Sequence, residues 1–296
     1  MLSIDVGFGN VKTYDGSELS AFPSIYALAW EGYIPKKDDQ LLELDGNRYH
    51  IGMTALRMSG ESPFDKEDLL RHKIFMLAAI CEATDKRDFE DEVLLGLPIG
   101  DYGFMAKKLQ RLKGEYDVVY NGKKRHIVVT KIKVYAQSEA VYNLLLKDDP
   151  SISHKIVGII DIGQKTVDVA YFNEGTFIRD RSGSYEIGVI NAYQQIAAAV
   201  ADKLGFEIED YAARKHTDKV PDVAKKAFSD MANGIKNRIA RKHWNMKEID
   251  ALYIVGGGTS LIAPYFKDTP YVEINAEKAV FANAYGYYEG EKGVGK

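Results

Sequence analysis

Residues that could bring the backbone close to an anionic ligand occur in two short segments, one near the start of the chain and one near its middle. The first segment reads IDVGFGNVK from Ile4, and the second reads IDIGQKTVD from Ile160. Each places a glycine two residues after an aspartate. A glycine lets the backbone come close to a ligand, and backbone N–H groups at such a turn can face an anion. The pattern predicts a site where the backbone faces an anion.

Both segments have the pattern of a β-hairpin, because an apolar strand leads into a short polar turn and a second apolar strand follows. The aspartates, Asp5 and Asp161, are separated by roughly half of the 296-residue chain. Two unrelated hairpins are the alternative. Because each copy stands at the head of one half of the chain, we favour an internal repeat.

A third candidate binding element lies near the end of the chain. The apolar segment 251–255 predicts a buried strand, and Gly256-Gly257-Gly258-Thr259-Ser260 follows it. We expect a helix from Leu261, with Ser or Thr as its N-cap and its first N–H groups open to a ligand. A flexible turn is the alternative, but three glycines at a strand-to-helix junction cost conformational entropy.

The remaining patterns supply the elements that would position these segments. Helical spacing of apolar residues predicts helices over 69–81, 139–146, 189–204 and 224–239. Strands are predicted over 93–98, 126–135 and 156–160, and a polar hairpin over 44–49. The break at 147–151 places a domain boundary near residue 150.

Composition excludes several classes of protein. A net charge of −4 and a pI of about 5.9 argue against a protein that grips nucleic acid through its phosphates. The sole cysteine, Cys81, rules out an internal disulfide and predicts a buried, inert thiol. No apolar stretch reaches the length of a membrane span. A first strand starting at Leu2 leaves no room for a signal peptide, so we expect a cytoplasmic protein.

Other nucleotide-binding and hydrolytic motifs are missing from the sequence. It has no Gly-x-x-x-x-Gly-Lys-Ser/Thr phosphate loop and no Gly-x-Gly-x-x-Gly that opens a helix after a strand. It also has no Gly-x-Ser-x-Gly elbow, and its six histidines lack zinc-like spacing.

The two hairpins and the late glycine turn, in this order, resemble the actin, heat-shock and sugar-kinase superfamily. Gly96-Leu97-Pro98-Ile99 and the segment 281–287 resemble ParM/StbA-type plasmid-segregation actins, and Phe22-Pro23-Ser24 also resembles archaeal actin-like proteins. The resemblance implies an α/β actin-like fold in which two pseudo-symmetric, ribonuclease-H-like domains flank a nucleotide cleft. Domain I would be 1–150, with an inserted subdomain within about 20–90 and a last helix at about 276–290 packing back on it. Domain II would be 151–275.

The resemblance also implies roles for individual residues. Asp5 and Asp161 would face each other and hold Mg²⁺ through water. The β- and γ-phosphates of ATP would lie against the first hairpin at Gly7, Phe8, Gly9, Asn10 and Lys12. A second phosphate cradle would be formed by Gly163, Gln164, Lys165 and Thr166, with Asp168 beside it. The α-phosphate and adenosine would lie near Gly256, Gly257 and Gly258, with Gly188 near the ribose and Lys236 near adenine.

Hydrolysis requires a group that positions water in line with the γ-phosphate. The family places this group where a strand runs into a helix, which here is Gln137. Glutamine cannot accept a proton at neutral pH, so its role would be to orient water, whereas several relatives have glutamate at this position. Glu139 is the second candidate, although an acid in a first helical turn also favours the helix dipole. A plain helix-start residue is the third interpretation of Gln137.

The function implied is a slow, assembly-coupled ATPase that polymerises into filaments for DNA or plasmid segregation or for a cytoskeletal role. Its partners would be further copies of itself, with a DNA-binding adaptor protein as a candidate partner and no direct contact with nucleic acid or membrane. A small-molecule kinase and a non-polymerising, chaperone-like ATP switch are the alternatives. The choice between ATP and GTP, and a plasmid, bacterial or archaeal origin, stay open.

Overall fold

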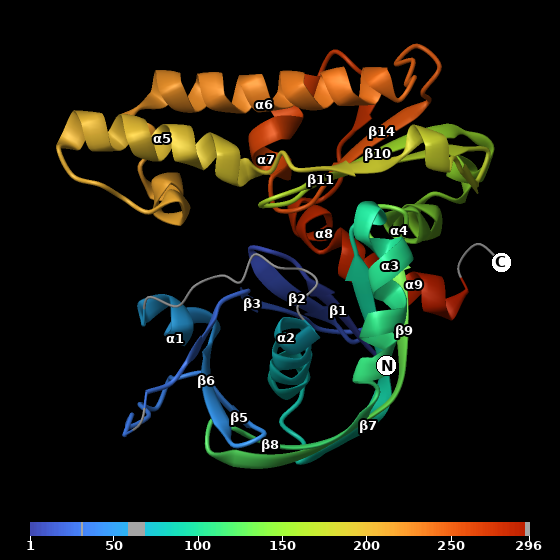
Figure 1. Cartoon of the computed structure of the whole chain (residues 1–296). Coiled ribbons are helices and arrows are strands. Elements are labelled where there is room, and N and C mark those ends of the chain that lie inside the picture. The colour runs from blue at the N-terminus through green and yellow to red at the C-terminus, as the bar shows by residue number, and fades with distance from the viewer. Residues whose placement is uncertain (31, 59–68, 294–296) are drawn as a thin grey trace. The chain divides into compact units, whose positions relative to one another are not determined.

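The computed structural model describes residues 1–30, 32–58 and 69–293 (Figure 1). Residues 31 and 59–68, which fall in the predicted inserted subdomain, lie outside the described residues. The chain divides into two compact units. Unit 1 comprises Met1–Asn143 and the chain from Asn283 onward, and unit 2 comprises Leu144–Ala282.

Unit 1 is built on a sheet that has nine strands among the described residues, in the order β3-β2-β1-β7-β9-β8-β5-β6-β4. The strands are β1 (Leu2–Val6), β2 (Asn10–Tyr14), β3 (Leu19–Pro23), β4 (Tyr26–Leu28), β5 (Leu41–Leu44), β6 (Asn47–Ile51), β7 (Asp88–Leu97), β8 (Gly114–Tyr120) and β9 (Lys123–Ala136). β1 pairs with β7 in parallel and with β2 antiparallel. β7 also pairs in parallel with β9, so the carboxyl ends of β1, β7 and β9 meet at one edge of the sheet.

The helices of unit 1 pack apolar residues against this sheet. They are α1 (Gly52–Arg57), α2 (Leu69–Ala83), α3 (Ile99–Leu109), the start of α4 (Val141–Asp148) and nearly all of α9 (Ala282–Lys292), with a 3₁₀ turn at Gln110–Leu112. Ile74, Phe75, Leu77 and Ile80 of α2 are fully buried in the core of unit 1. Each such side chain contributes about 1.5–3 kcal/mol when removed from water. This burial fixes α2 beside β1 and β2.

Unit 2 is built on a second sheet, in which the described residues form the order β12-β11-β10-β14-β15 with β13 on β11. Its strands are β10 (Ile156–Ile162), β11 (Val167–Asn173), β12 (Thr176–Phe177), β13 (Gly183–Tyr185), β14 (Ala251–Val255) and β15 (Tyr271–Val272). Its helices are α5 (Val189–Leu204), α6 (Pro221–Arg241), α7 (Thr259–Ile262) and α8 (Ala276–Val280). Short 3₁₀ helices lie at Pro150–His154, Arg179–Arg181, Asp210–Lys215, Thr217–Lys219 and Ala263–Phe266. α5 ends at Gly205, whose φ of 75° is left-handed as expected for a C-terminal glycine.

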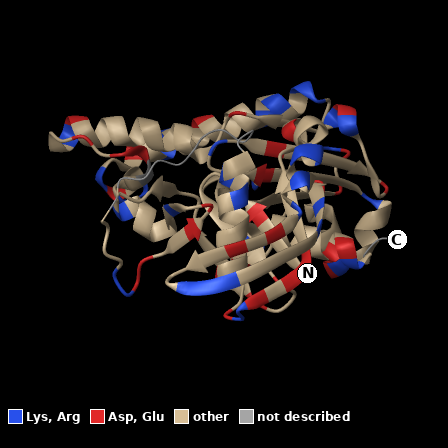
Figure 2. Ribbon diagram, turned by 60° about the horizontal axis from the view of Figure 1, so that its bottom comes forward, with Lys and Arg blue, Asp and Glu red and all other residues tan. Residues whose placement is uncertain are grey.

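The internal repeat is confirmed in the arrangement of the strands. β1 and β2 form an antiparallel hairpin with Asp5 opposite Lys12, and β10 and β11 form one with Asp161 opposite Asp168. In each unit the first strand of the hairpin also pairs in parallel with a later strand, β7 in unit 1 and β14 in unit 2. Figure 2 shows acidic and basic residues interspersed along the ribbons of this chain.

Two sequence expectations were wrong in detail. The last helix, expected at 276–290, is two helices, α8 and α9, because Phe281 interrupts the helical run. The N-cap of α7 is Gly258, not Ser or Thr. The hydroxyl of Thr259 instead donates to the carbonyl of Gly256, 2.8 Å away, and stabilises the glycine turn.

Candidate functional site

The first hairpin has a tight turn between Val6 and Asn10. A Cβ at Gly7 would lie 2.8 Å from the carbonyl oxygen of Asn10, so glycine is the residue that fits. The guanidinium of Arg71, from the first turn of α2, donates to the carbonyl of Gly7 at 2.9 Å. Arg71 is fully buried, and its Cζ lies 5.5 Å from the ring centre of Phe8 and 5.2 Å from that of Phe75. The turn is therefore fixed by a buried cation.

Sequence reasoning missed Arg71. The available signal was a cation at the head of the helix that carries the apolar run 74–81. Burying an arginine is costly unless its N–H groups and charge find partners. The burial of Arg71 beside a candidate phosphate turn therefore indicates that it holds this turn in position.

Asp5, Lys12 and Gln137 are brought together in unit 1. Asp5 is 2% exposed, and both of its carboxylate oxygens accept hydrogen bonds. Lys12 Nζ donates to Oδ2 at 3.2 Å, and Gln137 Nε2 donates to Oδ1 at 2.7 Å. These bonds offset the cost of burying the carboxylate. Gln137 is 132 residues from Asp5 along the chain, so the sheet and not local sequence creates this cluster.

Gln137 reaches Asp5 because parallel strands end at the same edge of the sheet. Leu97 at the end of β7 pairs with Ala136 at the end of β9. The N–H of Gln137 donates to the carbonyl of Leu97 at 2.7 Å, and the carbonyl of Gln137 accepts from the N–H of Glu139 at 2.6 Å. Glu139 thus lies in the turn before α4, where its backbone helps to shape the position of Gln137.

The other predicted residues of the first hairpin line its turn and its second strand. Phe8 is buried, whereas Asn10 is exposed. The carbonyl of Gly9 accepts from the N–H of Ser24 at 3.1 Å. Phe22-Pro23-Ser24 therefore supports the hairpin turn through β3.

The second hairpin places two buried carboxylates next to a glycine turn in unit 2. Asp161 is 7% exposed and Asp168 is 2% exposed. The N–H of Gly163 donates to the carbonyl of Thr166 at 2.9 Å and closes the turn. The side chains of Gln164 and Lys165, in the same turn, are half-buried.

The first residues of α5 form hydrogen bonds with backbone carbonyl groups of this second turn. The N–H of Val189 donates to the carbonyl of Gly163 at 3.2 Å, and that of Ile190 donates to the carbonyl of Gln164 at 2.9 Å. A Cβ at Gly188 would lie only 2.0 Å from the carbonyl oxygen of Gln164. Gly188 therefore allows close packing of α5 on the hairpin, and its contact with a ribose stays a prediction.

The glycine turn after β14 packs against β10. A Cβ at Gly256 would lie 2.3 Å from Asp161 Oδ1, and one at Gly258 would lie 2.3 Å from the Ile162 side chain. Gly256 has a φ of 88°, a backbone conformation that favours glycine. Gly257 is different: it is exposed, and apart from Gly257 itself and its two chain neighbours no heavy atom of the described chain lies within 4 Å of its Cβ position. Unit 2 thus brings Asp161 and the glycine turn together and leaves Gly257 open to a ligand.

Lys236 lies on α6 and forms an ion pair. Its Nζ is 3.2 Å from Asp268 Oδ1 and 5.0 Å from the ring centre of Phe266. The Asp268 side chain is 76% exposed, and such surface pairs contribute about 0–1 kcal/mol. The Lys236 ammonium has three N–H donors, so this pair leaves donors for a further contact, and an adenine contact by Lys236 stays a prediction.

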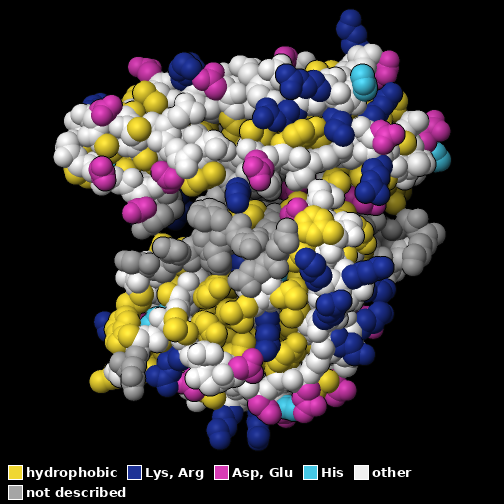
Figure 3. All heavy atoms as spheres, viewed as in Figure 1, with side chains coloured by type: hydrophobic (Ala, Val, Ile, Leu, Met, Phe, Trp, Pro, Cys, Tyr) yellow, Lys and Arg dark blue, Asp and Glu magenta, His cyan; other side chains and the backbone are white. Residues whose placement is uncertain are grey.

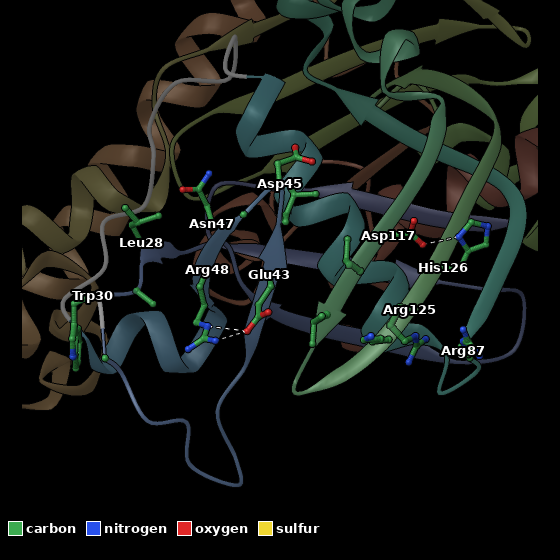
Figure 4. Close-up of a pocket in the computed structure, with 17 residues that line it drawn as sticks. Leu28, Trp30, Glu43, Asp45, Asn47, Arg48, Arg87, Asp117, Arg125 and His126 are labelled. Carbon is green, nitrogen blue, oxygen red and sulfur yellow. Dashed lines mark hydrogen bonds and ion pairs between the residues drawn. The ribbon is translucent and has the colours of Figure 1, made fainter.

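A separate groove of about 760 Å³ lies on unit 1 (Figure 4). It is lined by residues of β4, β5, β6, β8 and β9, and its polar floor includes the ion pair of Glu43 with Arg48. Asp117 Oδ1 lies 2.9 Å from His126 Nδ1, and this hydrogen bond raises the pKa of His126. The groove lining contains none of the residues that the sequence assigned to nucleotide, so its chemistry is separate from the hairpins.

Two properties of the described residues bear on metal and membrane binding. No group of three or more His, Cys, Asp and Glu side chains in the described ranges is placed to hold a metal ion directly. Within the same ranges, no helix is both long and apolar enough to cross a membrane.

Comparison with known proteins gives a consistent family. The model for the N-terminal domain of actin-like proteins matches residues 3–139, and the model for the C-terminal part of the archaeal, MreB-like actin homologue matches residues 159–268. Comparison with curated proteins gave no match.

Solved structures match the chain over its length. The archaeal actin homologue Ta0583, in complex with ADP, is 24% identical with a TM-score of 0.82, covering 98% of this chain and 99% of that chain. A 15-stranded ParM filament from Clostridium botulinum is 19% identical with a TM-score of 0.81, covering 98% of both chains. The Alp12 filament is 18% identical with a TM-score of 0.70, covering 98% and 97%. Repeated hairpins, paired family models and full-length likeness together show that this chain is an actin-like protein with an actin-like fold.

Proposed function

We propose that this protein binds ATP with Mg²⁺ through both hairpins and hydrolyses it. The observation that carries the proposal is the repeat itself: each unit has a hairpin with a buried aspartate, Asp5 or Asp161, two residues before a tight glycine turn. Such turns direct backbone N–H groups toward an anion. The ADP complex of Ta0583 supports a nucleotide as the ligand. We propose that the units correspond to domain I, 1–150, and domain II, 151–275.

The residues of the hairpins fit a magnesium nucleotide. Mg²⁺ usually keeps several waters and binds through one or two carboxylates and the phosphates of the nucleotide. Asp5 and Asp161 of the two hairpins would provide the carboxylates. When bound, the ion would neutralise negative charge on the phosphates. Lys12 adds a positive charge within 3.2 Å of Asp5, beside the first turn. Gly256, Gly257 and Gly258 would receive the α-phosphate and the nucleoside, and Gly257 has the space to do so.

Gln137 is the proposed water-positioning residue. Its side-chain amide already reaches the Asp5 carboxylate at 2.7 Å, which holds it at the carboxyl edge of the sheet. An amide can orient the attacking water but does not accept its proton, so we propose a slow turnover.

We also propose that the protein self-associates into filaments, for DNA segregation or a cytoskeletal role in the cytoplasm. The filament structures of the ParM from Clostridium botulinum and of Alp12 support this proposal. Hydrophobic side chains also lie on the surface of unit 1 (Figure 3). Among the residues of this unit, Leu28, Trp30 and Ile34 are 64%, 56% and 82% exposed. Exposed apolar clusters are typical of interaction surfaces.

The test of hydrolysis is phosphate release from ATP with and without Mg²⁺. We expect Gln137→Ala to slow release by about 100-fold, since misplacing a reacting group by about 1 Å can cost that much. Nucleotide affinity should survive, because the hairpin turns are unchanged. The matched control is Gln195→Ala, which removes an exposed glutamine of α5. Wild-type turnover in Gln137→Ala would remove this residue from the mechanism.

The test of assembly is sedimentation and light scattering of the protein with Mg-ATP, with Mg-ADP and without nucleotide. We expect assembly to depend on the nucleotide. No nucleotide-dependent assembly over a wide range of protein concentrations would contradict filament formation, whereas it would leave the proposed ATP binding intact.

A further inference from the structure

The turn that carries Gln137 contains an unfavourable backbone conformation. Ser138, the next residue, has a φ of 55°, in the left-handed region that non-glycine residues adopt uncommonly. Its side chain is fully buried. Such a conformation persists where the surrounding structure holds it in place, and these residues cluster at functional sites. The contacts of Ser138 therefore decide where Gln137 points.

The contact that holds Ser138 comes from α9, near the far end of the sequence. The N–H of Ser138 donates to the side-chain oxygen of Asn283 at 3.0 Å, and both residues are buried. On the other side of the turn, the N–H of Gln137 donates to the carbonyl of Leu97. Gln137 is thus fixed between a strand, β7, and a helix, α9.

The start of α9 is itself held rigidly. The hydroxyl of Ser3, two residues before Asp5 on β1, donates to the carbonyl of Ala284 at 2.6 Å. A Cβ at Gly286 would lie 2.2 Å from the carbonyl oxygen of Ala140, so α9 packs directly on the backbone after the turn. Asn283 is consequently held in place by β1, the same strand that carries Asp5.

We propose that Asn283 is a positioning residue for ATP hydrolysis, acting through Ser138 on Gln137. This inference rests on the proposed ATPase function. Without the Asn283 oxygen, the buried N–H of Ser138 either stays unpaired or turns to find another partner. If this N–H reorients, the peptide bond between Gln137 and Ser138 rotates, and the side-chain amide of Gln137 moves away from Asp5. Asn283 then contributes to the rate of the chemical step and not to nucleotide affinity.

Other contacts keep α9 in place when Asn283 is changed. Tyr287 stacks on Tyr135 with ring centres 5.6 Å apart, and Glu291 accepts a hydrogen bond from the Tyr135 hydroxyl at 2.8 Å. Glu291 also forms an ion pair with Lys133. Because these contacts do not involve Asn283, the Asn283→Ala protein should fold, and its melting temperature checks this.

The experiment compares phosphate release and nucleotide affinity in a small set of variants. Asn283→Ala should lower the release rate by about 10-fold or more while the Kd for the nucleotide changes less than about 2-fold. Asn283→Asp keeps an oxygen acceptor and should retain most of the rate. Asn143→Ala is the matched control, because the Asn143 side chain donates to the carbonyl of Gly286 on the same helix and not to Ser138, while the backbone bond from Asn143 to Ala140 is kept in the variant.

Two double variants test whether Asn283 acts through the turn. Combining Asn283→Ala with Gln137→Ala should cause no further loss of rate, because residues that act through one another are not additive. Combining it with Ser138→Gly should restore part of the rate, since glycine adopts the positive φ without strain.

The outcomes separate this inference from the function on which it rests. A wild-type protein that releases no phosphate from ATP overturns the proposed hydrolysis and the role of Asn283 with it. A hydrolysing wild type with an equally active Asn283→Ala variant overturns the role of Asn283 alone. An equal loss in Asn143→Ala, or a full further loss in the Gln137→Ala background, also overturns it, because the effect would then be general to α9.

Discussion

Replacing Gly188 by alanine should destabilise unit 2, because the added methyl group has no room. The Cβ would lie 2.0 Å from the carbonyl oxygen of Gln164, 2.2 Å from its carbon and 2.4 Å from the nitrogen of Lys165. These are backbone atoms of a closed hairpin turn, so they cannot swing aside as a flexible side chain would. The φ of Gly188 is −99°, which alanine adopts readily. The loss of stability would therefore come from the steric clash and not from backbone strain.

The magnitude follows from the displacement that alanine requires. Ordinary van der Waals contact needs more than 3.4 Å, so the start of α5 and the hairpin turn must separate by over 1 Å. Overpacking of this kind costs about 1–3 kcal/mol. Because the separation also stretches the bonds from Val189 and Ile190 to the turn, we expect the upper end, about 3 kcal/mol. At about 2–4 °C per kcal/mol, the melting temperature of unit 2 falls by roughly 6–12 °C.

Tryptophan fluorescence provides the assay. The chain has two tryptophans: Trp244 is buried in unit 2, and Trp30 is 56% exposed in unit 1. Thermal unfolding followed in a Trp30→Phe background therefore reports on unit 2. The control is Gly257→Ala, where the Cβ meets open space and stability should change by less than about 0.5 kcal/mol. A Gly188→Ala protein that melts within 1–2 °C of its parent, on the order of 0.5 kcal/mol, would refute the packing argument.

Two further predictions concern titratable groups. Burial raises the pKa of the Cys81 thiol to about 12, so native protein at pH 8 should resist a disulfide reagent and react once unfolded in urea; prompt native reaction would contradict this. The hydrogen bond to Asp117 raises the pKa of His126, so the pair stabilises the fold at low pH and loses this contribution as pH rises through the folded pKa. Asp117→Asn should lower that pKa in an NMR titration, and an unchanged value would show that the bond is absent in solution.

Local patterns were sufficient for most of the elements. The predicted strand at 93–98 forms the end of β7 as far as Leu97, the run at 251–255 is β14, and the helical spacing at 69–81 lies in α2. The predicted polar hairpin at 44–49 joins β5 to β6 through Asp45 and Gly46, which both have positive φ. These features succeed because strand alternation, helical spacing and turn chemistry are encoded within a few neighbouring residues.

Contacts between distant segments were not predictable from one sequence. The strand-to-helix pattern points to Gln137, but nothing in the neighbouring sequence shows that its side-chain amide meets Asp5. Arg71 has no local feature that points to Gly7, and Asn283 has none that points to Ser138. Each contact depends on sheet order and helix packing, which bring together residues 64 to 145 positions apart.

The position of α9 in unit 1 affects the order in which the protein can be completed during synthesis. All of unit 2, from Leu144 to Ala282, is translated before the last segment of unit 1 leaves the ribosome. Until then the N–H of Ser138 lacks the Asn283 oxygen, and the site beside Gly96 that later receives Tyr287 has no helix against it. Unit 1, although it begins the chain, is therefore the last of the two units to reach its final packing. A released chain that ends before Asn283 should therefore have a finished second unit and an incomplete first one.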